Sequence, residues 1–254
     1  MTDDNRHLYE LATLGFTIVK GVFDAPTVAE LRAQLQVALL NDQKWFADKA
    51  GKKADLVVDL TIHHPAFLQA LDNEIMQHLF SQVFGDTYIL YSYTSTILQP
   101  GTVSAVHTIH VDTNKFIPGY VTGLVMTVAL DDFTDENGAT LYLPGSHNCL
   151  NAPSAETFAQ YAVSTARSCG DALFFNPRVF HRAGENNSDR MRYGLTIYAT
   201  RAFMKPRFDF PRMIPQESLA NVSERVRRFL GFHARVPESL EQYYLPPEQR
   251  MYKV

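Results

Sequence analysis

Apolar and polar residues recur along this chain with two different periods, and each period predicts its own kind of element. Apolar residues at Val28, Leu31 and Leu35 recur every three or four positions, which predicts a helix from an N-cap at Asp24 to about residue 40. On the same grounds, further helices are predicted over 6–14, over 65–84 as a pair ending at Gly85, and around 217–230. These helices are expected to brace a core that is built elsewhere.

The middle of the chain, 87–201, has the shorter apolar runs of β-strands. Runs rich in Val, Ile, Tyr, Phe and Thr are separated by turns with Gly, Pro and Asn, a pattern typical of an antiparallel barrel or sandwich. Strands are predicted at 16–20, 88–98, 121–130, 139–143, 170–175 and 192–198. We therefore expect a mainly β protein with flanking α-helices. Loops that close over a substrate are expected where periodicity is lacking, at 42–60, 113–120, 150–162 and 202–216.

The composition of the chain limits the kinds of molecule that it is expected to bind. With 254 residues and no linker-like shift in composition, the chain is expected to form one domain. A formal net charge of −4, without a basic block, argues against nucleic acid as a partner. No apolar run approaches the roughly 18 residues of a membrane span, and the polar N-terminus does not resemble a signal peptide. Cys149 and Cys169 are expected to be reduced thiols, so the sequence predicts a cytoplasmic protein that binds a small molecule.

The segment His110-Val111-Asp112, together with the later His181, is the strongest candidate for a metal site. If the segment is extended, its first and third side chains point to the same side about 6.6 Å apart and can converge on one ion. Two imidazole nitrogens and one carboxylate oxygen on one face of an octahedron suit Fe(II) and leave positions for other ligands. Taken alone, His110 and Asp112 could cap a strand end, and His181 could be a buried structural histidine. Their combination favours metal binding.

Arg192 opens a predicted strand with two unlike faces. The polar face carries Arg192, Gly194, Thr196 and Tyr198. The other, more apolar face carries Tyr193, Leu195 and Ile197. A face with an arginine, a glycine and two hydroxyl groups suits the lining of a cavity. A planar guanidinium can hold a carboxylate there through two parallel hydrogen bonds. Arg190 lies two residues away and is expected to be an ordinary surface residue.

Several motifs, in this order, resemble the phytanoyl-CoA dioxygenase family. Leu11–Phe23 and the helix after it are similar to the opening of that family, and Asn137–His147 matches its central signature. Gly170–Phe175 matches the approach to the family's second histidine ligand, which corresponds to His181. The family has an arginine eleven residues after that histidine, and this position is Arg192. The resemblance covers most of the chain.

The resemblance implies a fold and an organisation. Members of this family have a double-stranded β-helix core of the jelly-roll, cupin-like kind. The whole chain, 1–254, would then be a single Fe(II)/2-oxoglutarate dioxygenase domain. Its parts would be an N-terminal helical support over about 1–86, the β-helix core over about 87–201 and a C-terminal extension over 202–254.

The resemblance also implies a reaction. Fe(II) would be bound by His110, Asp112 and His181, while 2-oxoglutarate would chelate the metal and place its far carboxylate on Arg192. With dioxygen, the co-substrate would be converted to succinate and CO2 while a substrate is hydroxylated. Asp112 argues against halogenation, because halogenating members have Gly or Ala in its place. Desaturation and ring formation by the same chemistry remain open.

The sequence defines the substrate class less closely than the reaction, and it leaves two alternative functions open. The expected substrate is a small carboxylate, an amino acid or a secondary-metabolite intermediate, since Lys52-Lys53 alone is thin evidence for the phosphates of a coenzyme A thioester. A cupin-type isomerase or lyase without 2-oxoglutarate is an alternative, against which the spacing of Arg192 argues. A second alternative is a barrel that only binds a ligand. The presence of all three candidate metal ligands argues against it. The sequence leaves the oligomeric state open.

Other polar and aromatic residues are weaker candidates. Contacts with the co-substrate are expected from Thr108, His107 and Thr140, of which His107 would need a bulged strand to reach it. Substrate contacts are expected from Tyr91, Tyr93, Trp45, Arg201 and Arg207. Structural roles are expected for His147, in a Pro-Gly-Ser-His turn, and for the adjacent His63 and His64.

Overall fold

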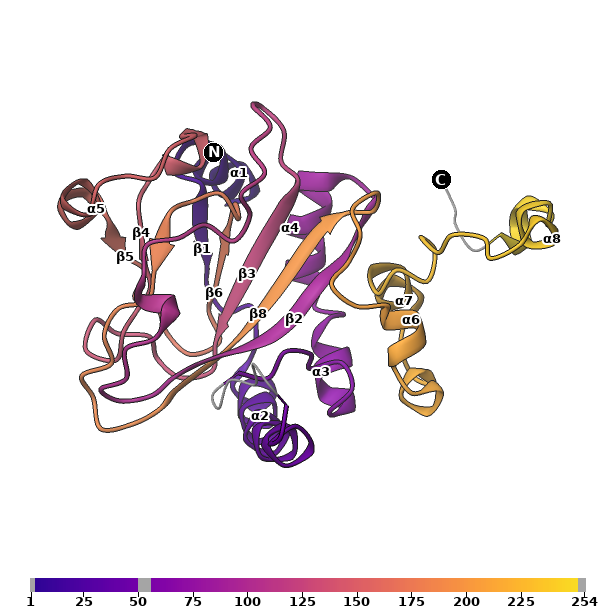
Figure 1. Ribbon diagram of the computed structural model, residues 1–254, viewed down its shortest axis with the longest axis horizontal. Helices are drawn as coiled ribbons and strands as arrows, with labels where there is room; N and C mark the ends of the chain where they lie inside the picture. Colours follow the sequence, from indigo (N-terminus) through magenta and orange to yellow (C-terminus); the bar gives the residue numbers. More distant parts are fainter. Residues whose placement is uncertain (1–2, 50–55, 251–254) are drawn as a thin grey trace.

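Two antiparallel sheets form the centre of the computed structural model, which describes residues 3–49 and 56–250 (Figure 1). The large sheet has the strand order β1-β6-β3-β8-β2, and the small sheet has the order β5-β4-β7. The large sheet contains β1 (Phe16–Val19), β2 (Tyr88–Leu98), β3 (Gly123–Ala129), β6 (Ala172–Phe175) and β8 (Arg192–Arg201). The small sheet contains β4 (Leu141–Tyr142), β5 (Val163–Ser164) and β7 (His181–Arg182).

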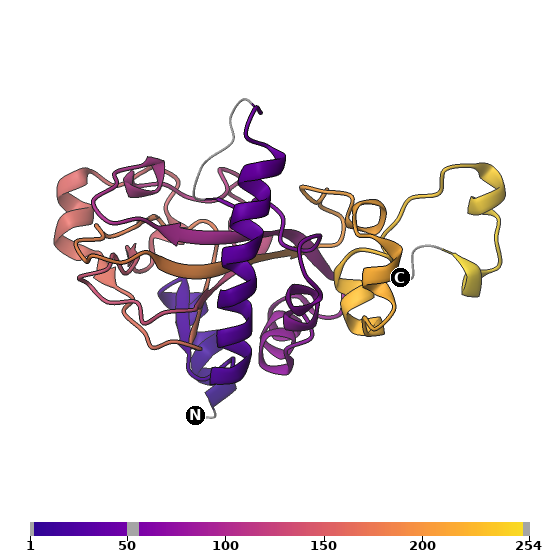
Figure 2. The same cartoon turned by 90° about the horizontal axis from the view of Figure 1, so that it is seen from below.

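The helices lie outside the sheets. They are α1 (Asp3–Thr13), α2 (Ala25–Trp45), α3 (Pro65–Ala70), α4 (Glu74–Phe84), α5 (Ala155–Tyr161), α6 (Phe210–Met213), α7 (Glu224–Phe229) and α8 (Leu240–Tyr243). Short 3-10 helices are η1 (Ala105–His107), η2 (Ser146–Asn148), η3 (Gln216–Leu219) and η4 (Pro247–Gln249). Figure 2 shows α2 as a long helix lying across the strands of the large sheet. In the described ranges, no helix combines the length and apolar character needed to span a bilayer.

Local sequence signals explain where the N-terminal helices begin and end. The Asp24 carboxylate accepts a hydrogen bond from the Thr27 amide at the start of α2, which is the predicted N-cap. His64 and Asn73 cap α3 and α4 in the same way. Helix α4 ends at Gly85, whose φ of 70° is accessible to glycine without strain. The predicted pair of helices over 65–84 is therefore confirmed.

The outward face of the large sheet is sealed by the helices. Its side chains, such as Leu124, Met126 and Leu195, share one apolar cluster with buried residues of α2, α3, α4 and α7. Within this cluster Val28, Leu31 and Leu35 are at most 3% exposed, as their helical spacing predicts. The inward face packs toward the small sheet through a second cluster that contains Val125, Phe175, Tyr142 and Tyr198.

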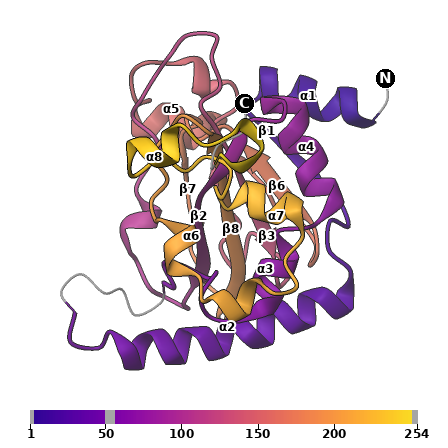
Figure 3. The ribbon, with the colours of Figure 1, turned by 90° about the vertical axis from the view of Figure 1, so that its right-hand side faces the viewer.

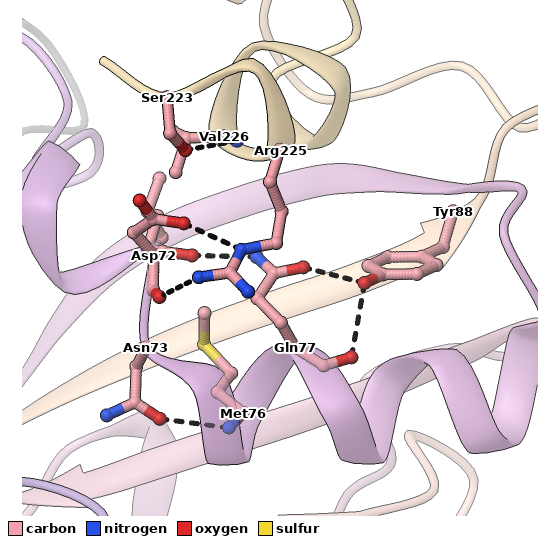
Figure 4. Close-up of polar contacts among 9 residues, drawn as sticks. Asp72, Asn73, Met76, Gln77, Tyr88, Ser223, Arg225 and Val226 are labelled. Atoms are coloured by element: carbon pink, nitrogen blue, oxygen red, sulfur yellow. Dashed lines mark hydrogen bonds and ion pairs between the residues drawn. The ribbon is translucent and has the colours of Figure 1, made fainter. Parts of the chain in front are cut away.

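The C-terminal extension lies beside the β2 edge of the large sheet (Figures 1 and 3). Arg225 of α7 donates one hydrogen bond to the Asp72 carboxylate and one to the Asp72 carbonyl, both at 2.7 Å (Figure 4). Below these bonds, the Tyr88 hydroxyl at the start of β2 donates to Gln77 Oε1 of α4 at 2.6 Å. Phe229 and Leu230 are each 1% exposed, so this part of the extension is fixed to the body by both polar and apolar contacts.

Several predicted elements are corrected by the structure. Helix α2 continues to Trp45, and α5 lies within 150–162, where no helix was expected. The single helix predicted over 217–230 is instead η3 followed by α7, because Ser223 starts a new N-cap between them. Residues 110–112 form an isolated bridge and a bend and not a strand. The Lys52-Lys53 pair and part of the predicted loop 42–60 lie outside the described residues.

Candidate metal centre

Three side chains from two separate segments converge at the β7 edge of the small sheet. His110, Asp112 and His181 place one ligand atom each within 4.8 Å of one another. The nearer Asp112 oxygen lies 3.8 Å from His110 Nε2 and 3.7 Å from His181 Nε2. His110 and His181 are held together by two backbone hydrogen bonds of 3.0 Å that form an antiparallel bridge. The bend at Asp112 brings the carboxylate to the two imidazoles in place of the predicted strand geometry.

Both imidazoles are oriented by the backbone. His110 Nδ1 lies 2.7 Å from the Thr108 carbonyl oxygen, and His181 Nδ1 lies 3.0 Å from the Val179 carbonyl oxygen. Since a carbonyl only accepts, each Nδ1 carries the proton and each Nε2 presents a lone pair. Such a carbonyl partner is the usual outer contact of a metal-binding histidine. Both rings are therefore prepared to ligate a metal through Nε2.

The surroundings of His181 keep it neutral and fixed. The Tyr142 ring stacks on the His181 ring at 5.0 Å with an interplanar angle of 12°, and Phe175 meets it edge-on at 5.1 Å. Burial lowers the pKa of His181 below its ordinary value, which favours the neutral form that binds metals. The side chains of His110 and Asp112 are 36% and 29% exposed, so the centre is open to solvent on their side.

The donor set fits a metal ion of the non-haem iron type. Two neutral imidazole nitrogens and one carboxylate oxygen are the protein ligands found in Fe(II) sites that keep positions open for a co-substrate. The Asp112 carboxylate has no hydrogen bond from a side chain or amide among the described residues, so its oxygens are available. The three ligands that the sequence predicts are thus brought together.

Arg192 is a buried cation without a carboxylate partner in the described part of the chain. It is 3% exposed, donates one hydrogen bond to the Gly138 carbonyl and has a buried Nε without a partner. Its guanidinium carbon lies 4.0 Å from the centre of the Phe133 ring. Burial, followed by the charge of Arg167, lowers the pKa of Arg192 to about 9, which still leaves it charged at neutral pH. Arg190 has a side chain that is 88% exposed, as predicted.

A second buried arginine, Arg167, was not predicted from the sequence. Its guanidinium carbon lies 4.3 Å from the centre of the same Phe133 ring, and its nitrogens donate to the Thr165 carbonyl and the Thr127 hydroxyl. Burial lowers its pKa to about 10. Arg167 reaches this place through a backbone bridge between two irregular segments, 133 and 167, which have no periodic signal. Two cations with few polar partners make this end of the sheet attractive to an anion.

The inward face of the large sheet, which carries Arg192, also carries small and hydroxyl-bearing residues. Register places Thr94, Thr127 and Thr196 side by side on β2, β3 and β8, and Thr96 opposite Gly194. Each of these threonines is partly exposed although its neighbours in sequence are buried, so solvent reaches the inward face at these positions. A Cβ atom at Gly194 would lie 2.9 Å from Phe133 and 2.9 Å from Thr96. The Val128 carbonyl oxygen would lie at 2.8 Å, so only glycine at this position allows the Phe133 ring beneath Arg192 to pack this closely against β8.

The weaker co-substrate candidates lie near the centre in different ways. Thr108 orients His110 through its carbonyl, while its side chain is exposed. His107 belongs to η1, with no bulged strand, and its Nδ1 accepts from the Ser104 amide at 3.0 Å while its Nε2 is buried without a partner. The Thr140 carbonyl accepts from both the amide and the hydroxyl of Thr165.

The other histidines of the sequence analysis have structural contacts. His147 Nε2 lies 3.2 Å from the Ala12 carbonyl of α1, which joins the turn at η2 to the N-terminal helix. His64 caps α3 through Nδ1, and His63 stacks on Trp45 at 5.5 Å. None of the three belongs to the metal cluster found among the described residues.

The five substrate candidates separate into two groups. Tyr91 and Arg207 lie together at the inward face, where Tyr91 contacts Tyr198 with ring centres 4.7 Å apart. Tyr93 faces outward and is fully buried in the helix-covered core, because the bulge at Tyr91 shifts the register of β2. Arg201 donates to the carbonyls of Val121 and Phe84, and Trp45 is 51% exposed at the end of α2. The structure does not bring Tyr93, Arg201 or Trp45 to the metal ligands.

Comparisons with known proteins agree on one family. The model of the phytanoyl-CoA dioxygenase family matches residues 12–194. The uncharacterized protein Rv1501 of Mycobacterium tuberculosis is 28% identical over 252 residues, with 96% of this chain and 92% of that protein covered.

Two solved structures have a similar fold. HygX from Streptomyces hygroscopicus, solved with nickel and 2-oxoglutarate bound, has a TM-score of 0.62 at 17% identity, covering 81% of this chain and 89% of HygX. The non-heme alpha-ketoglutarate-dependent carbocyclase SnoK from nogalamycin biosynthesis has a TM-score of 0.60 at 22% identity, covering 78% and 83%. Together with the family match, the order of the motifs and the convergence of the three ligands lead to one conclusion: the chain belongs to the phytanoyl-CoA dioxygenase family.

Proposed function

We propose that this protein is an Fe(II)- and 2-oxoglutarate-dependent oxygenase that hydroxylates a small organic molecule and releases succinate and CO2. The observation that carries the proposal is the presence of two features on the inward side of the sheets. Three ligand atoms lie within 4.8 Å of one another, with both Nδ1 atoms engaged by carbonyls. The buried Arg192 has an unpaired Nε and forms no ion pair with a carboxylate among the described residues, although Asp131 is near enough to act on its charge.

Each residue would have a distinct task. His110, Asp112 and His181 would hold the metal, and Arg192 would bind the far carboxylate of 2-oxoglutarate. When bound, iron and 2-oxoglutarate supply the oxidising chemistry, with dioxygen as the oxidant. Tyr142 and Phe175 fix the His181 ring and keep water from its buried edge. The partly exposed inward threonines would contact the chain of the co-substrate, and Thr108, His107 and Thr140 would line its surroundings.

We further propose that the two sheets are the walls of a double-stranded β-helix, in a single domain of the organisation expected from the sequence. The five-stranded and three-stranded antiparallel sheets support this, as does the likeness to the folds of HygX and SnoK. The anchoring of α7 to the turn before α4 supports treating 202–254 as part of the same unit.

Two alternatives differ in what they require of the site. Desaturation or ring formation would use the same ligands, and the carbocyclase SnoK shares the fold. A cupin-type isomerase or lyase would need the metal ligands but not a buried arginine without an anion. The buried Arg192, with an Nε that has no partner among the described residues, therefore favours the 2-oxoglutarate-dependent reaction.

The test is an anaerobic titration of the purified protein with Fe(II) and then with 2-oxoglutarate. We expect one Fe(II) per chain and the visible charge-transfer absorption of a 2-oxo acid chelated to iron. Succinate should then form when oxygen is admitted. An isomerase or lyase would bind metal without this absorption and without succinate, and that result would reject the proposal. Product analysis with a turned-over substrate separates hydroxylation from desaturation and ring formation.

A further inference from the structure

A cavity of about 630 Å³ lies within the C-terminal extension, where the extension meets the start of β2 at the edge of the large sheet. Its walls are the segments 202–212 and 230–238, and Ile89 of β2 closes one side. We refer to it as the C-terminal cavity. Its volume lies within the range of about 300–1,000 Å³ that is usual for small-molecule sites.

The C-terminal cavity has an excess of positive charge in a chain of negative net charge. Four basic and two acidic residues line it, namely Lys205, Arg207, Arg212, Arg235, Asp209 and Glu238. Arg212 pairs with both Asp209 and Glu238, and Arg235 pairs with Glu238, so these two arginines balance the two acids. Lys205 and Arg207 have no ion pair within the described part of the chain. Since the whole chain has a formal net charge of −4, this local excess is not a general property of its surface.

A β-bulge connects the cavity with the interior of the sheets. The register of β2 against β8 shifts between Leu90 and Ser92, which makes Tyr91 the extra residue and turns its ring toward Tyr198. Arg207 lies above this ring, with its guanidinium carbon 5.7 Å from the ring centre. The Arg207 amide also donates to the Tyr91 carbonyl at 3.0 Å, so the segment that carries the arginine is fixed to the bulge.

The aromatic surface continues to the metal ligands. Tyr198 belongs to the same inward cluster as Tyr142, the residue that stacks on His181. The ring of Tyr198 also requires Gly123 as its neighbour, because a Cβ atom there would lie 2.4 Å from the ring. Tyr91, Tyr198 and Tyr142 therefore belong to one apolar cluster that extends from Arg207 to the candidate metal centre, and the charges of both Arg207 and Asp112 act on Tyr198.

The wall of the cavity is held in place by the body of the protein. Phe210, at the start of α6, is fully buried in the outer core, and Leu230 is 1% exposed. Arg225 of α7 is bonded twice to Asp72, as Figure 4 shows. The cationic groups are thus presented from an anchored segment.

We infer that the C-terminal cavity is the subsite for the acid group of an organic-acid substrate, with Arg207 as its main contact and Lys205 beside it. The apolar part of the substrate would lie along Tyr91 and Tyr198 and place its reacting carbon at the metal centre. This inference rests on the proposed function for the identity of the ligand as a substrate. The free cations, the cavity volume and the aromatic path also predict binding of an apolar anion without any turnover.

The first experiment measures binding without metal. The probe is anilinonaphthalene sulfonate, an apolar anion with environment-sensitive fluorescence, and the matched neutral probe is phenylnaphthylamine, which lacks the sulfonate. In Arg207→Gln the affinity for the anionic probe should fall roughly tenfold, the effect of one lost charge-assisted contact. The affinity for the neutral probe should change by less than about twofold. Arg190→Gln, on an exposed arginine that does not line the cavity, is the control and should change neither.

Displacement then identifies the acid. Octanoate and octyl phosphate are competed against the anionic probe, with octanol as the neutral control, and the stronger competitor assigns the substrate as a carboxylate or a phosphate ester. Equal affinity of both probes for the unmodified protein, or an anionic affinity that is the same in Arg207→Gln, would overturn the inference. Iron and 2-oxoglutarate binding by the unmodified protein is measured separately. A failure there would reject the proposed function without affecting the result for the cavity.

Discussion

Strand β8 has unlike chemistry on its two faces. Outward, Tyr193, Leu195 and Ile197 enter one apolar cluster with the helices, and the last two are fully buried. Inward, Arg192 is buried with an unpaired Nε, and Thr196 stays partly exposed. One face has its contacts satisfied by the protein, and the other keeps polar groups that no protein group among the described residues satisfies.

This contrast assigns stability and function to different sides of the same sheet. Outward residues contribute through burial of apolar area, about 25 cal/mol per Å². Inward residues such as Arg192 and Arg167 lose solvation without gaining a carboxylate among the described residues, which destabilises the ligand-free fold. An anion that binds there restores the lost interaction, so the desolvation of these arginines favours ligand binding.

The largest expected effect follows from removing a metal ligand on the inner side. His181→Ala should reduce succinate formation to background, because the metal would keep only two protein ligands. Asp112→Ala should do the same, since it removes the only anionic ligand. Bound iron and turnover are measured together, with circular dichroism to check the fold. A His181→Ala protein with stoichiometric iron and full turnover would show that the ligand assignment is wrong.

The next largest effect is expected on the outward, helix-covered face of the large sheet. Leu195→Ala should lower the free energy of unfolding by about 2–5 kcal/mol, the usual range for a large-to-small change in a packed core. Thr196→Ala, one residue away and facing inward, should lower it by less than about 1 kcal/mol. Urea unfolding of the ligand-free proteins measures both values. Equal losses in the two variants would remove the distinction between the faces.

A comparable effect on binding, with little effect on stability, is expected at Arg192. Loss of a buried charge-assisted pair costs roughly 2–5 kcal/mol, so Arg192→Ala should weaken 2-oxoglutarate binding by a factor of about 30 to several thousand. Iron binding should persist. Arg190→Ala is the matched control and should change the affinity by no more than about twofold, because its side chain is 88% exposed. The 2-oxoglutarate dependence of succinate formation decides between the two arginines, and a large loss only in Arg190→Ala would reverse the assignment.

Periodic elements could be predicted from the sequence, whereas irregular ones could not. The strand 88–98 and the N-cap at Asp24 were predicted correctly because alternation and capping are local signals. Helix α5 was missed because its seven residues depend on a single buried anchor, Phe158, and on the cap at Ser154. The division of 217–230 into two short helices has the same cause, since one or two turns are too short to establish a period.

The candidate site shows the same limit in another form. His110, Asp112, His181 and Arg192 could be predicted because their order and spacing match a family motif. Arg167 could not, since it joins the site through a bridge to Phe133, and pairing between irregular segments has no signal in sequence. The bulge at Tyr91 was equally hidden, so Tyr91 and Tyr93 were given the same role although they face opposite sides.

The smallest expected effect concerns a buried polar group on the side of the small sheet. His147 is enclosed between α1 and the turn at Gly15, and burial lowers its pKa below the ordinary value of 6.5. At higher pH the histidine is neutral in both states and the free energy of unfolding does not depend on it. As the pH falls through about 6.5, the unfolded chain takes up the proton first, so stability is lost until the lower folded pKa is reached.

His147→Gln should therefore lose less stability than the unmodified protein between pH of about 7.5 and about 5.5 in urea unfolding. His181 titrates in the same sense in both proteins, so their difference reports on His147. An identical loss in the two proteins would show that this histidine is not a source of acid sensitivity.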